Sequence, residues 1–315
     1  MRRVLLVVVT MVFLTALSAF AQDASLVGTV ADETKAVLPG ATVTATNLET
    51  GVESVAVSDE RGDYRLPKLS PGKYKVKADL AGFGSIVVPS VELLVGQNAA
   101  VPFTLRIASV GEELTVTGEA PLVDITSSQV SGNVDRRQME QLPLQGRNWL
   151  ELSMMVKGIT ANNVSNQPGV SNDDFFQLNL DGQQITQKLA GSGFGQPAFS
   201  RDAIAEFQIV TSQFDITQGR SAGMQVQAIS KSGTNKNSGS LYGFFRDDAF
   251  NAPDNVAKTV LPYSDQQIGG TFGGPIVKDR LHYFFSYEYE RQPGTIFTQP
   301  QGLSGQSFTF PTKTT

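Results

Sequence analysis

One short segment restricts the fold of this chain more than any other. In residues 282–291, HYFFSYEYER, aromatic and polar side chains alternate, as they do on the two faces of an extended strand. One face carries Tyr283, Phe285, Tyr287 and Tyr289, and the other carries His282, Ser286, Glu288 and Glu290. An aromatic outward face over a polar inward face is typical of a membrane β-barrel, although a water-soluble sheet could also show it. The segment therefore favours strands that cross a membrane.

The first 21 residues predict export from the cytoplasm. Two arginines precede the apolar run 4–17, and small residues before position 22 predict signal-peptidase cleavage between Ala21 and Gln22. The apolar run covers about 14 residues, whereas a helix needs roughly 20 to cross a bilayer, so a signal peptide is favoured over a membrane anchor. The mature chain, from residue 22, is expected in the periplasm, outside the cell, or in an outer membrane as β-structure.

The composition favours a mainly β protein and argues against several kinds of site. The chain has 315 residues with 30 glycines and 15 prolines, which suits two or three turn-rich domains. Its net charge of −5 forms no basic stripe, so no nucleic-acid partner is expected. It contains no cysteine and one histidine, and its acidic residues lack calcium-loop spacing. The sequence therefore predicts no metal site and no cofactor.

Residues 22–107 are predicted to form a small antiparallel β-sandwich. Strand-like runs separated by turn residues cover 25–31, 41–47, 53–58, 72–80 and 99–106. In the fourth run, Tyr74, Val76 and Ala78 alternate with lysines, so the first set would face the core and the lysines would face water.

Two motifs within this region carry a family resemblance. The stretches GTVADETKAVLPGATVTATNLETG and VSDERGDYRLPKLSPGKYKVKADLAGF resemble the carboxypeptidase regulatory-like domain, a transthyretin-like sandwich also described as a carbohydrate-binding-like fold. The sequence supports this fold better than it supports any ligand, so a structural or docking module is favoured. Tyr64, Tyr74 and Phe83 are interpreted as core residues rather than as a platform for a sugar.

Residues 108–235 combine helix signals with strand signals. A capped helical run at 135–142 ends at Pro143, and a second helical run follows around Trp149. The pair Asp181 and Gly182 predicts a tight hairpin turn, and residues 207–211 and 224–230 are strand-like. The residues expected in the core of this region are Met139, Leu142, Trp149, Leu150 and Leu152.

Four ordered motifs carry a second resemblance, namely LPLQGRNWLELSMMVKGI, LNLDGQQI, IAEFQIVTSQFDITQGRSAG and AISKSGTNKNSGSLYGFFRDDAFNA. They resemble the plug and early barrel of TonB-dependent outer-membrane receptors, with the closest resemblance to the Oar-like group, which carries the same regulatory-like domain. The resemblance implies an α+β plug domain at 108–235 and the start of a transmembrane β-barrel at 236–315. Family barrels have many more strands than this region can supply, so an N-terminal fragment of a receptor is expected. One departure is that residues 217–220 read TQGR where the family more often has Tyr-Gly-Arg after a small or acidic residue.

A short β-prone segment, defined by Glu113, Leu114, Thr115, Val116 and Thr117, precedes the predicted plug. By itself it predicts only a strand that could extend a sheet edge. Its position resembles a TonB box, the peptide that pairs as a strand with the periplasmic domain of TonB; an ordinary first strand of the plug is the alternative. The resemblance implies as partners TonB with its inner-membrane energising complex, outer-membrane lipid, and an unidentified transported ligand such as a carbohydrate or a siderophore-like molecule.

An enzyme is not expected, despite one motif. Residues 219–223, GRSAG, match the Gly-x-Ser-x-Gly nucleophile elbow, which needs a strand before it and a helix after it. Here residues 224–229 alternate as a strand, and the chain has no repeating strand–helix pattern.

These features together predict an outer-membrane TonB-dependent transporter whose N-terminal sandwich lies in the periplasm. Transport would follow from a TonB-driven rearrangement of the plug, without covalent chemistry. The alternative is a secreted or surface-bound carbohydrate-binding or adhesion module.

Overall fold

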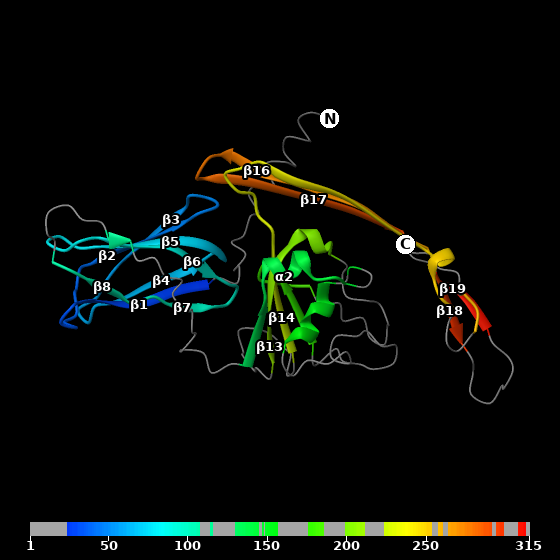
Figure 1. The fold of residues 1–315 in the computed structure, drawn as a ribbon, viewed down its shortest axis with the longest axis horizontal. Helices are drawn as coiled ribbons and strands as arrows, with labels where there is room; N and C mark the ends of the chain where they lie inside the picture. The colour runs from blue at the N-terminus through cyan, green and yellow to red at the C-terminus, as the bar shows by residue number, and fades with distance from the viewer. Residues whose placement is uncertain are drawn as a thin grey trace, which may run out of the picture. The chain divides into compact units, whose positions relative to one another are not determined.

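A computed structural model describes most of the chain after residue 23. The described residues are 24–107, 114–115, 130–144, 147, 149–156, 176–185, 199–211, 224–253, 258–260, 264–291, 294–298 and 308–312. The chain divides into two compact units, residues 1–231 with 277–281 and residues 232–276 with 282–315 (Figure 1). The predicted signal peptide and its cleavage site lie outside the described residues.

The first unit begins with a β-sandwich, as predicted. One sheet has the order β3 (Glu53–Val57), β2 (Thr42–Asn47), β5 (Gly72–Asp79), β6 (Ile86–Leu93) and β9 (Leu114–Thr115). The other has the order β4 (Asp63–Leu69), β1 (Ala24–Asp32) and β7 (Asn98–Ala100), and β8 (Phe103–Leu105) also pairs with β1. Two strands, β4 and β6, were not predicted, because Pro67 and Pro89 interrupt their patterns.

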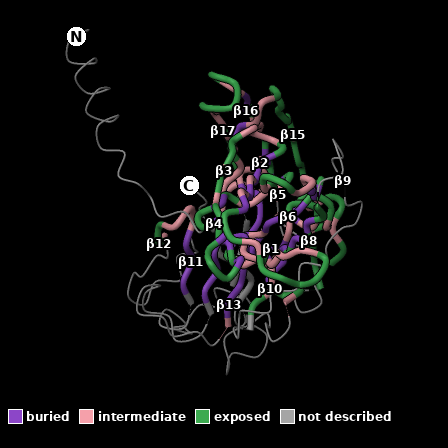
Figure 2. Tube along the Cα trace, turned by 90° about the vertical axis from the view of Figure 1, so that its left-hand side faces the viewer, coloured by how far each residue is buried: buried purple, intermediate pink, exposed green. Residues whose placement is uncertain are grey.

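Alternating side chains build the core of the sandwich. Tyr74, Val76 and Ala78 of β5 are buried, as predicted, and Figure 2 shows buried residues following the strands. The Tyr64 hydroxyl is also buried and donates a 2.6 Å hydrogen bond to the carbonyl of Val101. Gly28 lies beneath this pair, where an added Cβ would be 2.2 Å from the Val101 carbonyl oxygen. A side chain at position 28 is therefore excluded by neighbouring backbone.

A third sheet in the first unit, together with its helices, forms what we call the central α+β region, within residues 130–231. Its strand order is β10 (Val130–Val134), β13 (Ile204–Thr211), β14 (Met224–Ser230), β11 (Phe176–Leu180) and β12 (Gln183–Gln184). Its helical elements are α2 (Arg136–Gln141), η2 (Trp149–Met155) and η3 (Arg201–Ala203). Strands β11 and β14 are parallel, while β13 is antiparallel to both β10 and β14.

The helices of the central α+β region cover one face of its sheet, as Figure 1 shows for α2. Met139, Trp149 and Leu152 pack against Phe207 in a shared core, and the rings of Trp149 and Phe207 meet edge to face with centroids 5.1 Å apart. Leu150 is buried and Leu142 is partly buried, so the core predicted for this region is confirmed.

Local signals set the ends of these elements as the sequence predicts. Asp135 accepts a 2.8 Å hydrogen bond from the backbone of Gln138, whose side chain in turn accepts one from the backbone of Asp135, so α2 begins with a capping box. Asp181 and Gly182 both have positive φ and join β11 to β12 as a tight hairpin.

The second unit contains three long neighbouring strands in the order β15 (Ser238–Asp247), β16 (Ser264–Val277) and β17 (Leu281–Arg291), with 10, 14 and 11 residues. The strands predicted at 239–246, 267–276 and 282–291 are thus confirmed, and β16 is longer than predicted. A short helical turn, η4 (Asp248–Phe250), follows β15, and β18 (Gly294–Thr298) pairs with β19 (Phe308–Thr312). Within the described parts of both units, none of the helices has the length and apolar character required to span a membrane.

The long strands have two chemically different faces. Leu241, Phe245, Phe285, Tyr287 and Tyr289 project from one face and are 53% to 88% exposed. On the other face polar side chains bond across strands: Tyr242 with Glu288 at 2.8 Å, Gln267 with Glu290 at 3.0 Å, and Ser240 with Thr271 at 2.8 Å. The alternation predicted for β17 therefore extends to its neighbours, with the exception of Phe244, which lies on the polar face beside Tyr242.

Candidate functional site

Two residues of the β-prone segment 113–117 form strand β9. Leu114 pairs with Ile86 and Thr115 with Val87, and β9 runs parallel to β6 at the edge of the larger sandwich sheet. The segment therefore adds a strand to a sheet edge, which is the behaviour that its β-propensity predicts. Glu113, Val116 and Thr117 lie outside the described residues, and the role of the segment as a TonB box remains a prediction.

The sandwich contacts the central α+β region through the β6–β7 turn, residues 94–97. The backbone N–H of Val95 donates a 2.6 Å hydrogen bond to Oε1 of Glu206 on β13. The carbonyl of Val95 accepts a 3.1 Å hydrogen bond from Nδ2 of Asn133 on β10. One turn residue of the sandwich thus bonds to two neighbouring strands of the other sheet. This contact was not predicted from the sequence.

The turn approaches the central sheet closely because it contains a glycine. Gly96 has a φ of +68°, and an added Cβ would lie 2.3 Å from Oε1 of Gln208 on β13. Val95 has no exposed surface, and Glu206 is 7% exposed. The hydrogen bonds between the turn and the sheet are therefore largely shielded from water.

Burial changes the acidity of Glu206. Desolvation is the largest effect and raises the pKa of this carboxyl to about 7, against the backbone hydrogen bond from Val95 and the charge of Arg136, which both lower it. The negative charges of Glu92 and Asp135 raise it further. Arg136, at the start of α2, also forms a 2.9 Å ion pair with Glu49 of the sandwich. The carboxyl of Glu206 therefore changes its protonation close to neutral pH.

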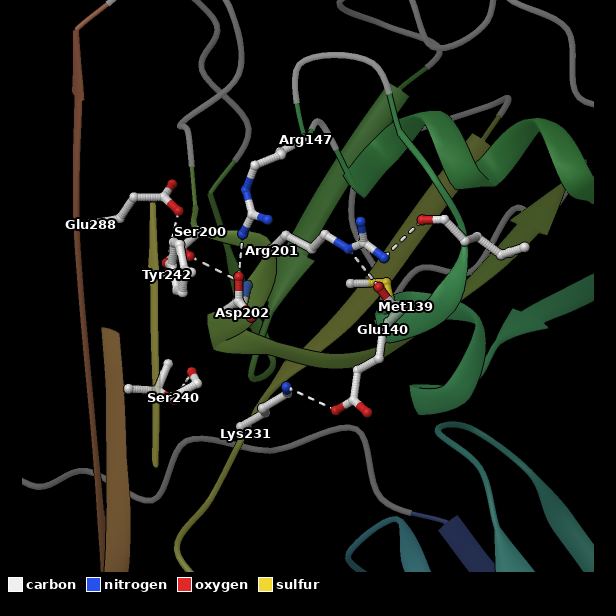
Figure 3. Close-up of polar contacts among 12 residues, drawn as sticks. Met139, Glu140, Arg147, Ser200, Arg201, Asp202, Lys231, Ser240, Tyr242 and Glu288 are labelled. Carbon is white, nitrogen blue, oxygen red and sulfur yellow. Dashed lines mark hydrogen bonds and ion pairs between the residues drawn. The ribbon is translucent and has the colours of Figure 1, made fainter. Parts of the chain in front are cut away.

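A group of charged residues holds the other end of α2 (Figure 3). The guanidinium of Arg201 donates to the carbonyls of Met139 and Leu142, the latter at 2.9 Å, and so binds carbonyl groups that the end of a helix leaves unpaired. Arg147 forms an ion pair with Asp202 within the same region. These contacts explain how η3 is anchored to α2, and they indicate a structural role.

The sheet face opposite this core is lined by buried polar side chains, namely Gln177, Asn179, Glu206, Gln208, Gln225 and Gln227. Such residues are costly to bury unless they are hydrogen bonded. Gln177 and Asn179 bond to each other at 2.9 Å. The sequence signal for this face was the alternation of polar and apolar residues along β13 and β14.

The catalytic and metal-binding alternatives gain no support from the described residues. The elbow-like motif at 219–223 lies outside them, and the segment that follows it is strand β14, as predicted, rather than the helix that an elbow needs. Among the residues that the structure describes, no group of three or more His, Asp or Glu side chains could hold a metal ion.

Two parts of the chain match known protein families. Residues 25–106 match the carboxypeptidase regulatory-like domain, and residues 229–313 match an outer membrane beta barrel domain. The TonB-dependent transporter Oar of Myxococcus xanthus is 26% identical to this chain over 292 residues, covering 86% of the chain and 27% of that relative. The chain thus spans about a quarter of the length of the curated relative that it matches.

Solved structures show partial similarity. The siderophore receptor PirA from Acinetobacter baumannii is 18% identical, with a TM-score of 0.37, over 52% of this chain and 24% of its own. Catechol 1,2-dioxygenase from Pseudomonas arvilla C-1 is 12% identical, with a TM-score of 0.23, over 28% of this chain and 53% of its own.

The family matches confirm the mainly β fold with a regulatory-like sandwich and outer-membrane barrel strands. They also confirm the predicted location in an outer membrane. The chain is similar to a TonB-dependent transporter along most of its length.

Proposed function

We propose that this protein is a TonB-dependent outer-membrane transporter. The observation that carries the proposal is the similarity to the transporter Oar, because it extends over 292 residues and so includes the sandwich, the central α+β region and the long strands. The two-faced sheet of β15, β16 and β17 supports it. Its exposed aromatic face suits contact with lipid, and its hydrogen-bonded polar face suits the inside of a barrel.

The central α+β region would act as the plug of this transporter. It lies in the chain directly before the long strands, and it has a compact core of its own around Phe207. A folded element inside a barrel blocks the lumen, so a ligand could pass only after the plug rearranges. The ligand would be an unidentified small molecule, of which a carbohydrate or a siderophore-like compound are examples.

The segment from Glu113 to Thr117 would be the place where TonB binds. A peptide that pairs as a strand is held by a row of main-chain hydrogen bonds, which can transmit a pulling force along the backbone. Because the next described strand after this segment is β10, force applied to the segment would reach the central sheet at β10. TonB with its inner-membrane energising complex would supply that force from the periplasm, where the sandwich would lie.

The chain contains no cysteine, so a single introduced thiol can test this role. In outer membranes that contain a TonB with a cysteine on its edge strand, Thr117→Cys should form a disulfide with TonB. Ser127→Cys, in the same connection but beyond the segment, is the matched control and should form little. Equal capture at both positions would place the TonB-binding segment elsewhere. Recovery of the protein in a soluble extracellular pool would contradict the transporter itself and favour the binding-module alternative.

A further inference from the structure

We propose that the β6–β7 turn of the sandwich, residues 94–97, is a clamp that holds strand β10 on the central sheet and opposes its extraction. This inference rests on the proposed function, because it assumes that force reaches β10 through the segment 113–117. It assigns to the sandwich a mechanical role in addition to any role as a docking module.

The geometry of Val95 carries the inference. Its N–H bonds to Glu206 on β13 at 2.6 Å, and its carbonyl accepts from Asn133 on β10 at 3.1 Å. The turn therefore bridges the two strands that would have to separate when β10 leaves the sheet. Asn133 and Gln208 are themselves direct partners in the ladder between β10 and β13, so the turn contacts this ladder at one of its five pairs.

The position of β10 makes such a clamp effective. It is an edge strand, bonded on one side to β13 and on the other side to no strand in the described part of the sheet. Five residue pairs, from Val130 with Thr211 to Val134 with Phe207, hold it in place. A contact that joins β10 to the sandwich adds resistance to extraction beyond that of the residue pairs with β13.

A second contact lies beside the first. Arg136, two residues after the end of β10, forms a 2.9 Å ion pair with Glu49 in the β2–β3 turn of the sandwich. Both side chains are more than a third exposed, so this pair contributes little and mainly marks that the two surfaces meet. The shielded hydrogen bonds of Val95 would provide most of the resistance to extraction of β10.

Docking can be measured with nitroxide labels at the exposed positions Leu48→Cys and Arg137→Cys, which leave the neighbouring Glu49–Arg136 ion pair intact and whose dipolar broadening reports that the two bodies are close. In the full chain in outer membranes, Asn133→Asp should reduce this broadening strongly, because it replaces the donor to Val95 with a carboxylate beside Glu206. Ser131→Asp adds the same charge to an exposed position of the same strand and should leave the broadening unchanged. Persistent broadening with Asn133→Asp would show that the Val95 contact does not hold the two bodies together.

The mechanical consequence can be measured in cells. Val134 is buried at the end of β10, so a thiol at Val134→Cys should react with a maleimide only when β10 leaves the sheet. With energised TonB, Asn133→Asp should increase this labelling several-fold over Ser131→Asp, and the excess should vanish without TonB.

Misfolding and failure of the proposed function give different results. If Val134→Cys is labelled in the Asn133→Asp variant without TonB, this substitution has disrupted the fold. Gly96→Ala then replaces it in the labelling experiment, because its Cβ would press on Gln208 and weaken the contact from the sandwich side. The clamp alone would be overturned if TonB were captured normally at Thr117→Cys while Val134→Cys was labelled equally in the Ser131→Asp and Asn133→Asp variants. Absence of capture in every variant would overturn the proposed function instead.

Discussion

Protonation of Glu206 should control how tightly the sandwich docks on the central α+β region. In the docked protein, burial raises the pKa of Glu206 from its ordinary 4.5 to about 7. Undocking would expose the carboxyl to water and return its pKa to the ordinary value, so the docked form binds the proton more tightly. The stabilisation is fully present below pH 4.5 and is lost as the pH rises through about 7.

The size of the effect follows from the same two values. A fall in the pKa from about 7 to 4.5 corresponds to roughly 3 kcal/mol, so the docking equilibrium should be at most about 300-fold weaker at alkaline than at acidic pH. The charges that face Glu206 are Arg136, which favours its ionised form, and Glu92 and Asp135, which oppose it. The pKa of about 7 already includes the effects of these neighbours. They therefore set the pH at which docking weakens, but not whether docking weakens or strengthens as the pH rises.

The assay is the dipolar broadening between labels at Leu48→Cys and Arg137→Cys, which keep Glu49 and Arg136, followed from pH 4 to pH 9. The docked fraction should fall with rising pH in the parent protein. Glu206→Gln should abolish the dependence, because glutamine keeps an oxygen acceptor for the Val95 N–H and does not titrate. The matched control is Glu92→Gln, an exposed change of the same kind, which should keep the pH dependence. A profile that rises with pH, or one that survives in Glu206→Gln, would refute the reasoning.

Three further predictions concern stability. Gly28→Ala should destabilise the sandwich by about 1–3 kcal/mol in chemical unfolding, since the new Cβ would meet the Val101 carbonyl; an unchanged midpoint would mean that the backbone can shift. Phe207→Ala should cost about 3–5 kcal/mol in the central α+β region, measured by loss of its protection from hydrogen exchange. Phe285→Arg, on the exposed aromatic face, should cost about 2–4 kcal/mol and lower recovery in the outer membrane, whereas Ser286→Arg on the opposite face should cost less; equal recovery would contradict the assignment of the lipid face.

Much of the fold could be predicted because its signals are local. Alternation identified the core of β5 and the two faces of β17, and the Asp181–Gly182 pair identified a hairpin. The strands β4 and β6 escaped prediction for a local reason as well. Each contains a proline, and β6 opens with three consecutive apolar residues, so neither shows a clean period of two.

The contacts of the candidate site could not be predicted in the same way. The segment 113–117 could be recognised as β-prone, but a strand's composition does not say which sheet edge it joins. The Val95 contact is made by backbone atoms to residues 38 and 111 positions away. Backbone N–H and carbonyl groups are common to nearly all residues, so such a contact requires no particular residue at position 95 that a sequence could reveal. The available signal was Glu206 itself, an acidic residue between Ala205 and Phe207 in a strand that is otherwise uncharged.

The arrangement of these contacts implies an order of events under the proposed function. Among the residues that the structure describes, β9 is held on β6 by two residue pairs, whereas β10 is held by five pairs and by the contact with Val95. A force applied at 113–117 therefore meets its weakest resistance at β9, which would separate from the sandwich first and leave the segment free to pair fully with TonB. Extraction of β10 would follow only after the hydrogen bonds of Val95 in the β6–β7 turn break. The sandwich would thus release the TonB-binding segment at low force and oppose the extraction of β10 up to a higher force. Binding of TonB alone would then leave the barrel closed.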